Sequence, residues 1–226
     1  MITGETRLVG LLGDPVSGSL SPLMQNAAFA ARGLDWAYVP LAVQTERLED
    51  AVTGLVALGF AGANVTTPHK VAVAKLVGAD LASVNTLVVR DGQLHGESTD
   101  AAILTGVEFE RAAILGDGGA ATAFAEALPG AVRFSRRGAW PPDVDGVDLV
   151  VNATSERDEP LVDLRAGQTL VDLPYPGTAT AREAEQNGAH VVDGLEVLVA
   201  QGAAAFELWT GVPAPVDVMR SAVRSA

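Results

Sequence analysis

Short apolar runs alternate with amphipathic stretches along the first part of the chain. Buried strands are predicted by three of these runs, at residues 7–12, 36–43 and 62–65. Helices are predicted at residues 22–32, at residues 48–58 and from about residue 67. Ser21 is the expected N-cap of the first helix, and Thr67 followed by Pro68 is the expected start of the third. Strands that alternate with helices predict a parallel sheet whose faces are covered by the helices.

A hairpin comes next, and a second α/β pattern follows it. Asp91-Gly92 lies between two apolar segments, at 83–89 and 93–96, and is a strong hairpin signal. Asp100 should begin a short helix that ends near Gly106. Further strands are predicted at 111–115, 131–135, 149–152, 169–173 and 190–192. Further helices are predicted after the glycine-rich turn as far as about 128, and at 182–186, 195–209 and 216–223.

The segment between Arg137 and Asp148 is too short for an ordinary helical crossover. Only ten residues separate the two positions, and two of the ten are prolines, so no helix is expected there. The predicted fold class is α/β, with an N-terminal domain rich in parallel strands and a second, trimmed α/β domain. C-terminal helices should pack back on the first domain. The expected bounds are 1–104, 105–195 and 196–226.

The composition of the chain excludes several classes of partner and of catalytic chemistry. Of the 226 residues, 48% are hydrophobic and 19% are charged, which is typical of a globular protein with a full core. The net charge of −13 argues against a nucleic-acid partner. The absence of cysteine excludes disulfides and cysteine nucleophiles, and three widely spaced histidines make no metal-ligand pattern. No apolar run reaches membrane-spanning length and no signal-peptide pattern is present, so a cytoplasmic location is expected.

Lys70 lies in the expected first turn of the third helix. A cation there opposes the helix dipole, at a cost of roughly a few tenths of a kcal/mol, and the position favours the neutral amine that proton transfer needs. The chain has only two lysines, Lys70 and Lys75, against thirteen arginines. Lys70 is therefore a candidate catalytic residue, and a solvated lysine is the alternative. Asp100 is either a helix cap or a carboxylate partner of Lys70, and spacing alone does not choose.

A glycine-rich turn, Gly116 to Ala121, joins a predicted strand to an alanine-rich helix. This is the context of a dinucleotide fingerprint, in which the helix N-terminus holds a pyrophosphate. The next strand ends at Ser135 and is followed by Arg136 and Arg137, where an NAD site would have an acidic residue. Two arginines fit a ribose phosphate by charge and geometry. NADP is therefore the expected cofactor, with a plain turn and solvated arginines as the alternative.

Together these motifs resemble the shikimate dehydrogenase family over nearly the whole chain. The matching segments are Gly13-Asp14-Pro15, Ser19-Leu20-Ser21-Pro22, Asn64-Val65-Thr66, Pro68-His69-Lys70, Val84-Asn85-Thr86, Ser98-Thr99-Asp100, Asn152-Ala153-Thr154, Asp172-Leu173-Pro174-Tyr175, 194–201 and 205–211. Enzymes of this family reduce 3-dehydroshikimate to shikimate with NADPH, on the route to aromatic amino acids.

The resemblance implies that the first domain binds the substrate and that the second is a trimmed Rossmann-like dinucleotide-binding domain. It also implies a role for each matching residue. The implied catalytic pair is Lys70 and Asp100. The implied substrate contacts are Ser19 and Ser21 at the carboxylate, together with Asn64, Thr66, Asn85, Tyr175 and Gln201. The implied cofactor contacts are Gly116, Gly118, Gly119 and Ala120 at the pyrophosphate, Arg136 at the ribose phosphate, and Leu173 and Gly194 near the nicotinamide.

The chain departs from the family pattern mainly in its cofactor half. Gly18 and Ser98 are changes near the substrate motifs, whereas Asp117, the segment 155–160 and the shortened crossover all lie in the cofactor half. Two rival functions remain open: an NAD-using enzyme that also oxidises quinate, and a shikimate-binding relative with impaired cofactor use. The expected partner is a small-molecule substrate, and homodimer formation is left open.

Overall fold

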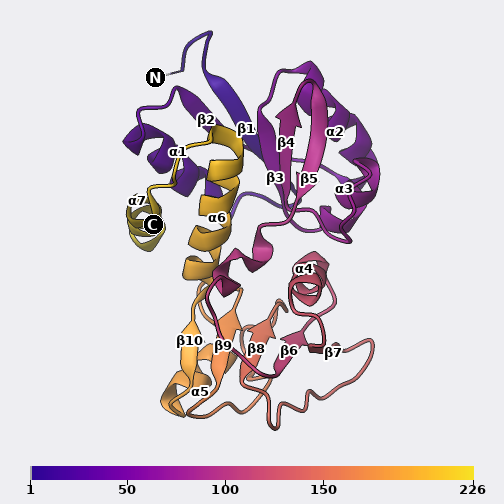
Figure 1. The fold of residues 1–226 in the computed structure, drawn as a ribbon, viewed down its shortest axis with the longest axis vertical. Helices are drawn as coiled ribbons and strands as arrows, with labels where there is room; N and C mark the ends of the chain where they lie inside the picture. The colour runs from indigo at the N-terminus through magenta and orange to yellow at the C-terminus, as the bar shows by residue number, and fades with distance from the viewer. Residues whose placement is uncertain (1) are drawn as a thin grey trace. The chain divides into compact units, whose positions relative to one another are not determined.

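The computed structural model describes residues 2–226 and divides the chain into two compact units (Figure 1). The first unit contains the described residues up to Thr99 together with Val199–Ala226, and the second contains Asp100–Leu198. The division therefore falls inside the long helix α6 (Gly194–Thr210).

The first unit is built on a five-stranded mixed sheet in the order β2-β1-β3-β4-β5. The strands are β1 (Arg7–Gly13), β2 (Trp36–Ala42), β3 (Gly62–Val65), β4 (Thr86–Arg90) and β5 (Gln93–Glu97). β1 runs parallel to β2 and β3, β4 is antiparallel to β3, and β5 is antiparallel to β4. The hairpin prediction is confirmed, because Asp91 and Gly92 both have the positive φ angles, 52° and 73°, that a tight two-residue turn requires.

Helices lie on both faces of this sheet. They are α1 (Ser21–Ala31), η1 (Thr45–Arg47), α2 (Leu48–Ala57), α3 (Lys70–Leu76), the larger part of α6, and α7 (Val216–Arg224). Residues of α2 and α3 pack with Leu12 and Leu87 in one cluster, which includes Val39 of β2. Because neighbouring strand residues point to opposite faces, Tyr38 lies on the other face, with its ring 6.0 Å from that of Trp209 in α6.

Two predicted helix starts in this unit are wrong. Ser21 is not the N-cap of α1 but its first residue, and the cap position is Leu20, with no side-chain capping bond. Thr67 does not cap α3 either. The His69 N–H donates to the Thr66 carbonyl over 3.0 Å, so that residues 66–69 form a turn, and α3 begins only at Lys70.

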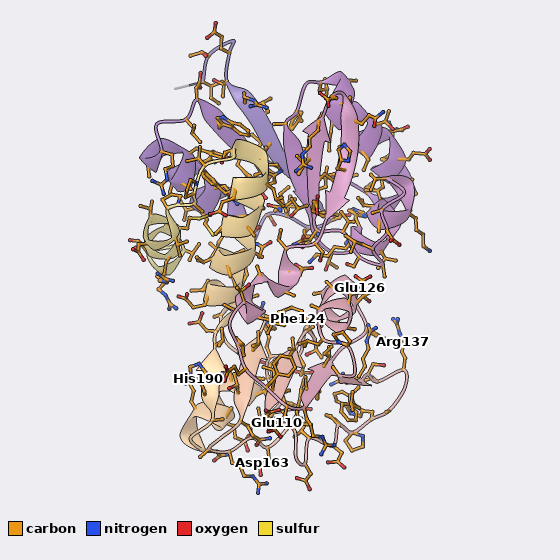
Figure 2. The ribbon with its side chains drawn as sticks, viewed as in Figure 1. Glu110, Phe124, Glu126, Arg137, Asp163 and His190 are labelled. Atoms are coloured by element: carbon orange, nitrogen blue, oxygen red, sulfur yellow. The ribbon has the colours of Figure 1, made fainter. Side chains whose placement is uncertain are left out.

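The second unit is a fully parallel five-stranded sheet in the order β10-β9-β8-β6-β7. Its strands are β6 (Ala112–Leu115), β7 (Val132–Phe134), β8 (Leu149–Asn152), β9 (Thr169–Asp172) and β10 (His190–Val192). Its helices are η2 (Asp100–Leu104), α4 (Gly119–Ala127), α5 (Ala179–Gln186) and the start of α6. In Figure 2, the label of Phe124 marks the α4 side of this sheet, where the buried ring packs against Ile114 and Val151.

The connection from β7 to β8 contains no helix in this described segment, as predicted. Trp140, Val144 and Val147 from that connection instead pack on the sheet face that also receives Ala181 and Ala184 of α5. A loop with three apolar side chains thus covers the surface that a crossover helix would otherwise bury. The trimmed unit therefore keeps a closed core on both faces of its sheet.

Candidate functional site

The loops that follow β1 and β3 are joined by backbone hydrogen bonds. The Asp14 N–H donates to the Thr67 carbonyl over 3.1 Å, and the Thr66 N–H donates to the Leu12 carbonyl over 2.8 Å. A Cβ at Gly13 would come within 2.3 Å of the Thr66 side chain, so the close approach of the two loops requires glycine there. The parallel pairing of β1 with β3 places both loops at the carboxyl ends of their strands, where α/β sheets bind ligands.

Each of these loops leads into a helix that begins with a predicted site residue. Ser21 is the first residue of α1 and is buried, and its N–H donates to the Ser19 hydroxyl oxygen over 3.2 Å. Lys70 is the first residue of α3, whose first turn contains no acidic residue. Lys70 is thus even closer to the helix N-terminus than its sequence context predicts, so its charge opposes the helix dipole as expected.

A buried network of amides and hydroxyls lies at the ends of β3 and β4. The Tyr38 hydroxyl donates to Asn64 Oδ1 over 2.9 Å, and Asn64 Nδ2 donates to the Thr86 hydroxyl oxygen over 3.0 Å. Asn85 Oδ1 accepts from the Thr99 N–H over 2.7 Å. All five residues are buried. Because every amide here has a partner, the network fixes the orientation of two predicted substrate residues, Asn64 and Asn85.

Gln201 joins this network from a distant part of the sequence. Asn85 Nδ2 donates to Gln201 Oε1 over 3.3 Å and to the Thr99 hydroxyl oxygen over 3.0 Å. Trp209, two turns further along α6, donates from Nε1 to the Leu87 carbonyl over 2.9 Å. The tryptophan bond therefore fixes α6 against β4, and the structure brings together three of the predicted substrate residues: Asn64, Asn85 and Gln201.

Two further predicted residues lie in the second unit. Asp100 is buried and is the first residue of η2. Tyr175 follows β9, and its carbonyl accepts from Arg157 Nη2 over 3.0 Å. Because Lys70 belongs to the first unit and Asp100 to the second, their pairing stays a prediction.

The glycine-rich turn has the backbone geometry of a phosphate site. Gly116 has a φ of +124°, and a Cβ there would meet the Ala153 carbonyl oxygen at 2.9 Å. A Cβ at Gly118 would have nothing within 4 Å, so the space in front of α4 is open at that residue. Gly119 and Ala120 form the first turn of α4. The open turn and the helix N-terminus fit the pyrophosphate of a dinucleotide.

Arg133, which the sequence reasoning missed, holds this turn in place. Its Nε donates to the Gly116 carbonyl over 2.9 Å, and its Nη2 lies 3.4 Å from the Thr122 hydroxyl oxygen. Arg133 is exposed, so its position in the sequence of β7 does not distinguish it from a solvated surface arginine.

The arginines after β7 lie in a tight turn. The Gly138 N–H donates to the Ser135 carbonyl over 2.9 Å, and the Ser135 N–H donates to the Ala139 carbonyl over 3.1 Å. Arg136 and Arg137 are exposed, and Arg137 is labelled on this loop in Figure 2. No acidic residue occupies the end of β7, so the side chains there fit a phosphate-bearing ribose. The Asp117 carboxylate lies in the glycine turn and forms an ion pair with Arg137, so its negative charge is partly neutralised.

The buried carboxylate of Asp172 organises the end of β9. It accepts from Asn152 Nδ2 over 2.7 Å and from the Thr178 hydroxyl over 3.1 Å. Burial raises the pKa of the Asp172 carboxyl above its ordinary value, although these hydrogen bonds oppose the shift. Leu173 follows immediately, and a Cβ at Gly194 would lie 2.5 Å from the Leu173 carbonyl oxygen. The two predicted nicotinamide-side residues are therefore in close backbone contact.

The described residues add neither a metal centre nor a membrane segment to this site. Residues 2–226 contain no cluster of three or more histidine, aspartate or glutamate side chains arranged for a metal ion. Within the same range, no helix is long and apolar enough to cross a membrane.

Comparison with known proteins places the chain in a family. Residues 11–87 match the model of the shikimate dehydrogenase substrate binding domain, and residues 194–224 match the shikimate 5'-dehydrogenase C-terminal domain. A protein of Anaeromyxobacter sp. (strain Fw109-5) named shikimate dehydrogenase (NADP(+)) is 40% identical over 272 residues, which cover 99% of this chain and 98% of the relative. That alignment is longer than the present chain, so the relative has segments that this protein lacks.

Two solved structures extend the similarity to the fold. The shikimate dehydrogenase of Aquifex aeolicus has a TM-score of 0.89 at 30% identity, with 99% of this chain and 100% of that chain covered. The shikimate 5-dehydrogenase of Thermus thermophilus, in complex with NADP(H) and shikimate, has a TM-score of 0.85 at 30% identity, with 97% and 99% covered. With 40% identity to a named relative over 99% of its length, and with the same fold as these structures, the chain belongs to the shikimate dehydrogenase family.

Proposed function

We propose that the protein is an NADP-dependent shikimate dehydrogenase, which catalyses the reversible reduction of 3-dehydroshikimate to shikimate. The observation that supports this most strongly is the 40% identity over 99% of the chain to a relative named shikimate dehydrogenase (NADP(+)). The conformation of the glycine-rich turn and the arginines that follow β7 support the choice of cofactor. Shikimate is a small-molecule partner, and its polar groups match a site made of amides and hydroxyls.

In this proposal Lys70 is the proton donor of the reaction. Reduction of a ketone builds negative charge on its oxygen, so a proton must arrive there or the charge must be stabilised. The Lys70 ammonium Nζ would donate that proton, and Asp100 would hold the ammonium and accept a hydrogen bond from a neighbouring hydroxyl of the substrate. The position of Lys70 at the start of α3 supports this role, because the helix dipole opposes a charge that serves only as a surface cation.

The other predicted residues would bind and orient the substrate and the cofactor. Ser19 and Ser21 would donate to the substrate carboxylate, and Thr66 and Tyr175 would complete the contacts made by Asn64, Asn85 and Gln201. Gly116, Gly118, Gly119 and Ala120 would hold the pyrophosphate, Ser135, Arg136 and Arg137 the ribose phosphate, and Leu173 and Gly194 the nicotinamide end. NADPH, when bound, supplies the hydride.

The test is a turnover assay of the purified protein with shikimate or quinate and either NADP or NAD, followed by the absorbance of the reduced nicotinamide. We expect reduction of NADP that depends on shikimate. Tight binding of shikimate without turnover would instead support a binding protein, and equal use of quinate would support the broader dehydrogenase. The same preparation tests the homodimer by its hydrodynamic size.

A further inference from the structure

Both arginines that should receive the ribose phosphate are already paired with carboxylates of this chain. Arg136 Nη2 lies 3.1 Å from Glu156 Oε2, and Arg137 Nη1 lies 3.5 Å from Asp117 Oδ2. The arginines follow β7, Asp117 follows β6 and Glu156 follows β8. These three strands are neighbours in a parallel sheet, so their carboxyl ends bring the four charges to one edge.

Glu156 is fixed in its position by the loop that contains it. Its Oε1 accepts from the backbone N–H groups of Arg157 and Asp158 over 3.1 and 3.2 Å, and its own N–H lies 3.3 Å from the Thr154 hydroxyl oxygen. The Asp158 N–H and the Arg136 guanidinium lower the pKa of the Glu156 carboxyl below its ordinary value. Glu156 is therefore a preformed, ionised partner for Arg136.

Arg136 is held from a second side as well. Its guanidinium carbon lies 5.7 Å from the centroid of the Trp140 ring, which comes from the loop that replaces the crossover helix. A guanidinium between an aromatic face and a carboxylate has satisfied both of its preferred interactions. A phosphate that approaches Arg136 must displace Glu156 or share the guanidinium with a like charge.

We propose that Glu156, supported by Asp117, competes with the ribose phosphate of NADP for the arginines, and so keeps the preference for NADP over NAD below what the arginines alone would give. This inference rests on the proposed function, because it concerns the cofactor of that reaction. A carboxylate and a ribose phosphate are both anions that match the guanidinium fork. NAD, which lacks the phosphate, leaves both ion pairs intact.

The size of the effect follows from exposure. The Arg136 side chain is 64% exposed and that of Glu156 is 24% exposed, and ion pairs near the surface contribute modestly because water screens them. Removal of the Glu156 charge should therefore tighten phosphate binding by about 1.5- to 5-fold. The gain should shrink as ionic strength rises.

The experiment measures binding directly, so that its outcome does not depend on turnover. Isothermal titration of the unmodified protein and of Glu156→Gln is carried out with adenosine 2′,5′-bisphosphate and with adenosine 5′-monophosphate. Glutamine keeps the shape of glutamate and the acceptor for Arg157 and Asp158. We expect the bisphosphate to bind about 1.5- to 5-fold more tightly to the variant, with no change for the monophosphate. Asp117→Asn should act in the same direction and more weakly, because its ion pair is longer and more exposed.

Glu159→Gln is the matched control. It removes the same charge three positions away, from a residue that forms no ion pair in the described part of the chain. Competition also predicts coupling, so Glu156→Gln should have no effect on bisphosphate binding once Arg136 is replaced by alanine. An equal gain from Glu159→Gln, or a full gain in the Arg136→Ala background, would show general charge repulsion and overturn the proposal.

Other outcomes of the titrations would also overturn the proposal. If Glu156 positions Arg136 rather than competing for it, Glu156→Gln will weaken bisphosphate binding, and the proposal is wrong. Unchanged bisphosphate binding, or equal tightening of both nucleotides, also overturns it while leaving the proposed function intact. Failure of the unmodified protein and the variant to bind either nucleotide, NADPH or NADH would overturn the proposed function, and this inference with it.

Discussion

Asn85 donates a hydrogen bond to Gln201, a residue 116 positions later in the chain, over 3.3 Å. The bond connects the start of β4 to α6, and the same Asn85 amide accepts from the Thr99 N–H over 2.7 Å. A single buried amide thus connects three segments of the first unit. Because Asn85 is only 2% exposed, water cannot replace its hydrogen bonds. Removal of the side chain should therefore lower the free energy of unfolding.

Asn85→Ala should therefore destabilise the protein. The variant leaves the buried N–H of Thr99 without its acceptor, which costs about 1–3 kcal/mol in the free energy of unfolding. The urea midpoint should fall accordingly. Gln93→Ala removes an exposed amide from β5 of the same sheet and should leave the midpoint nearly unchanged. Equal midpoints for the two variants would show that the Asn85 network does not stabilise the fold.

The two lysines of α3 allow a controlled test of the catalytic role of Lys70, with Lys75 as the control. Lys70→Ala should lower kcat roughly 10²- to 10⁴-fold, because the ketone oxygen loses its proton donor. The KM for shikimate should change less. Lys75→Ala removes the other lysine, which is exposed in the last turn of the same helix, and should keep normal kcat. Normal kcat for Lys70→Ala would eliminate Lys70 as the acid. Asp100→Asn should lose rate as well.

Ser19 and Ser21 should affect substrate binding alone. Replacement of either by alanine leaves the substrate carboxylate short of one donor, at a cost of about 1.5–3 kcal/mol for a charged hydrogen bond. The loss should appear in the KM for shikimate and not in the KM for NADP. Ser17→Ala, an exposed change in the same loop, is the control. A rise in the KM for NADP alone would remove both serines from the substrate site.

Cofactor preference should depend on Arg136. We expect kcat/KM to favour NADP over NAD by at least about tenfold, equivalent to about 1.4 kcal/mol. Arg136→Ala should erase most of this preference and change NAD use little, and Arg137→Ala should have a smaller effect. Arg165→Ala removes an exposed arginine elsewhere in the second unit and should leave the preference intact. Equal kcat/KM for the two cofactors in the unmodified protein would contradict the phosphate site.

The stability of the protein should respond to pH through Asp172. Burial raises the pKa of this carboxyl in the folded protein above its ordinary value of 3.8, so the folded state binds the proton more tightly than the unfolded state. The stability that Asp172 contributes is then present at low pH and falls as the pH rises through its raised pKa. The difference in urea midpoint between the unmodified protein and Asp172→Asn should decrease as the pH is raised above 3.8. A constant difference would show that Asp172 does not titrate in this range.

The sequence by itself determined the elements and the residue types of the candidate site. Local signals sufficed where the cause is local. The turn at Asp91-Gly92 is an example, as is the missing helix before Asp148. The expected N-cap of α1 was misplaced by one residue and that of α3 by two. For α3 the reason is that Thr67 and Pro68 also favour a turn, and the bond from His69 to Thr66 selected it.

Only the tertiary structure decided which side chains meet. Asn85 and Gln201 come together because α6 returns to β4, and no local pattern encodes that contact. The sequence presented Arg136 and Arg137 as free for a phosphate, whereas strand order brings Glu156 and Asp117 to them. Charges that are far apart in sequence interact only when neighbouring strands place them within a few ångströms, because water and salt screen them at longer range.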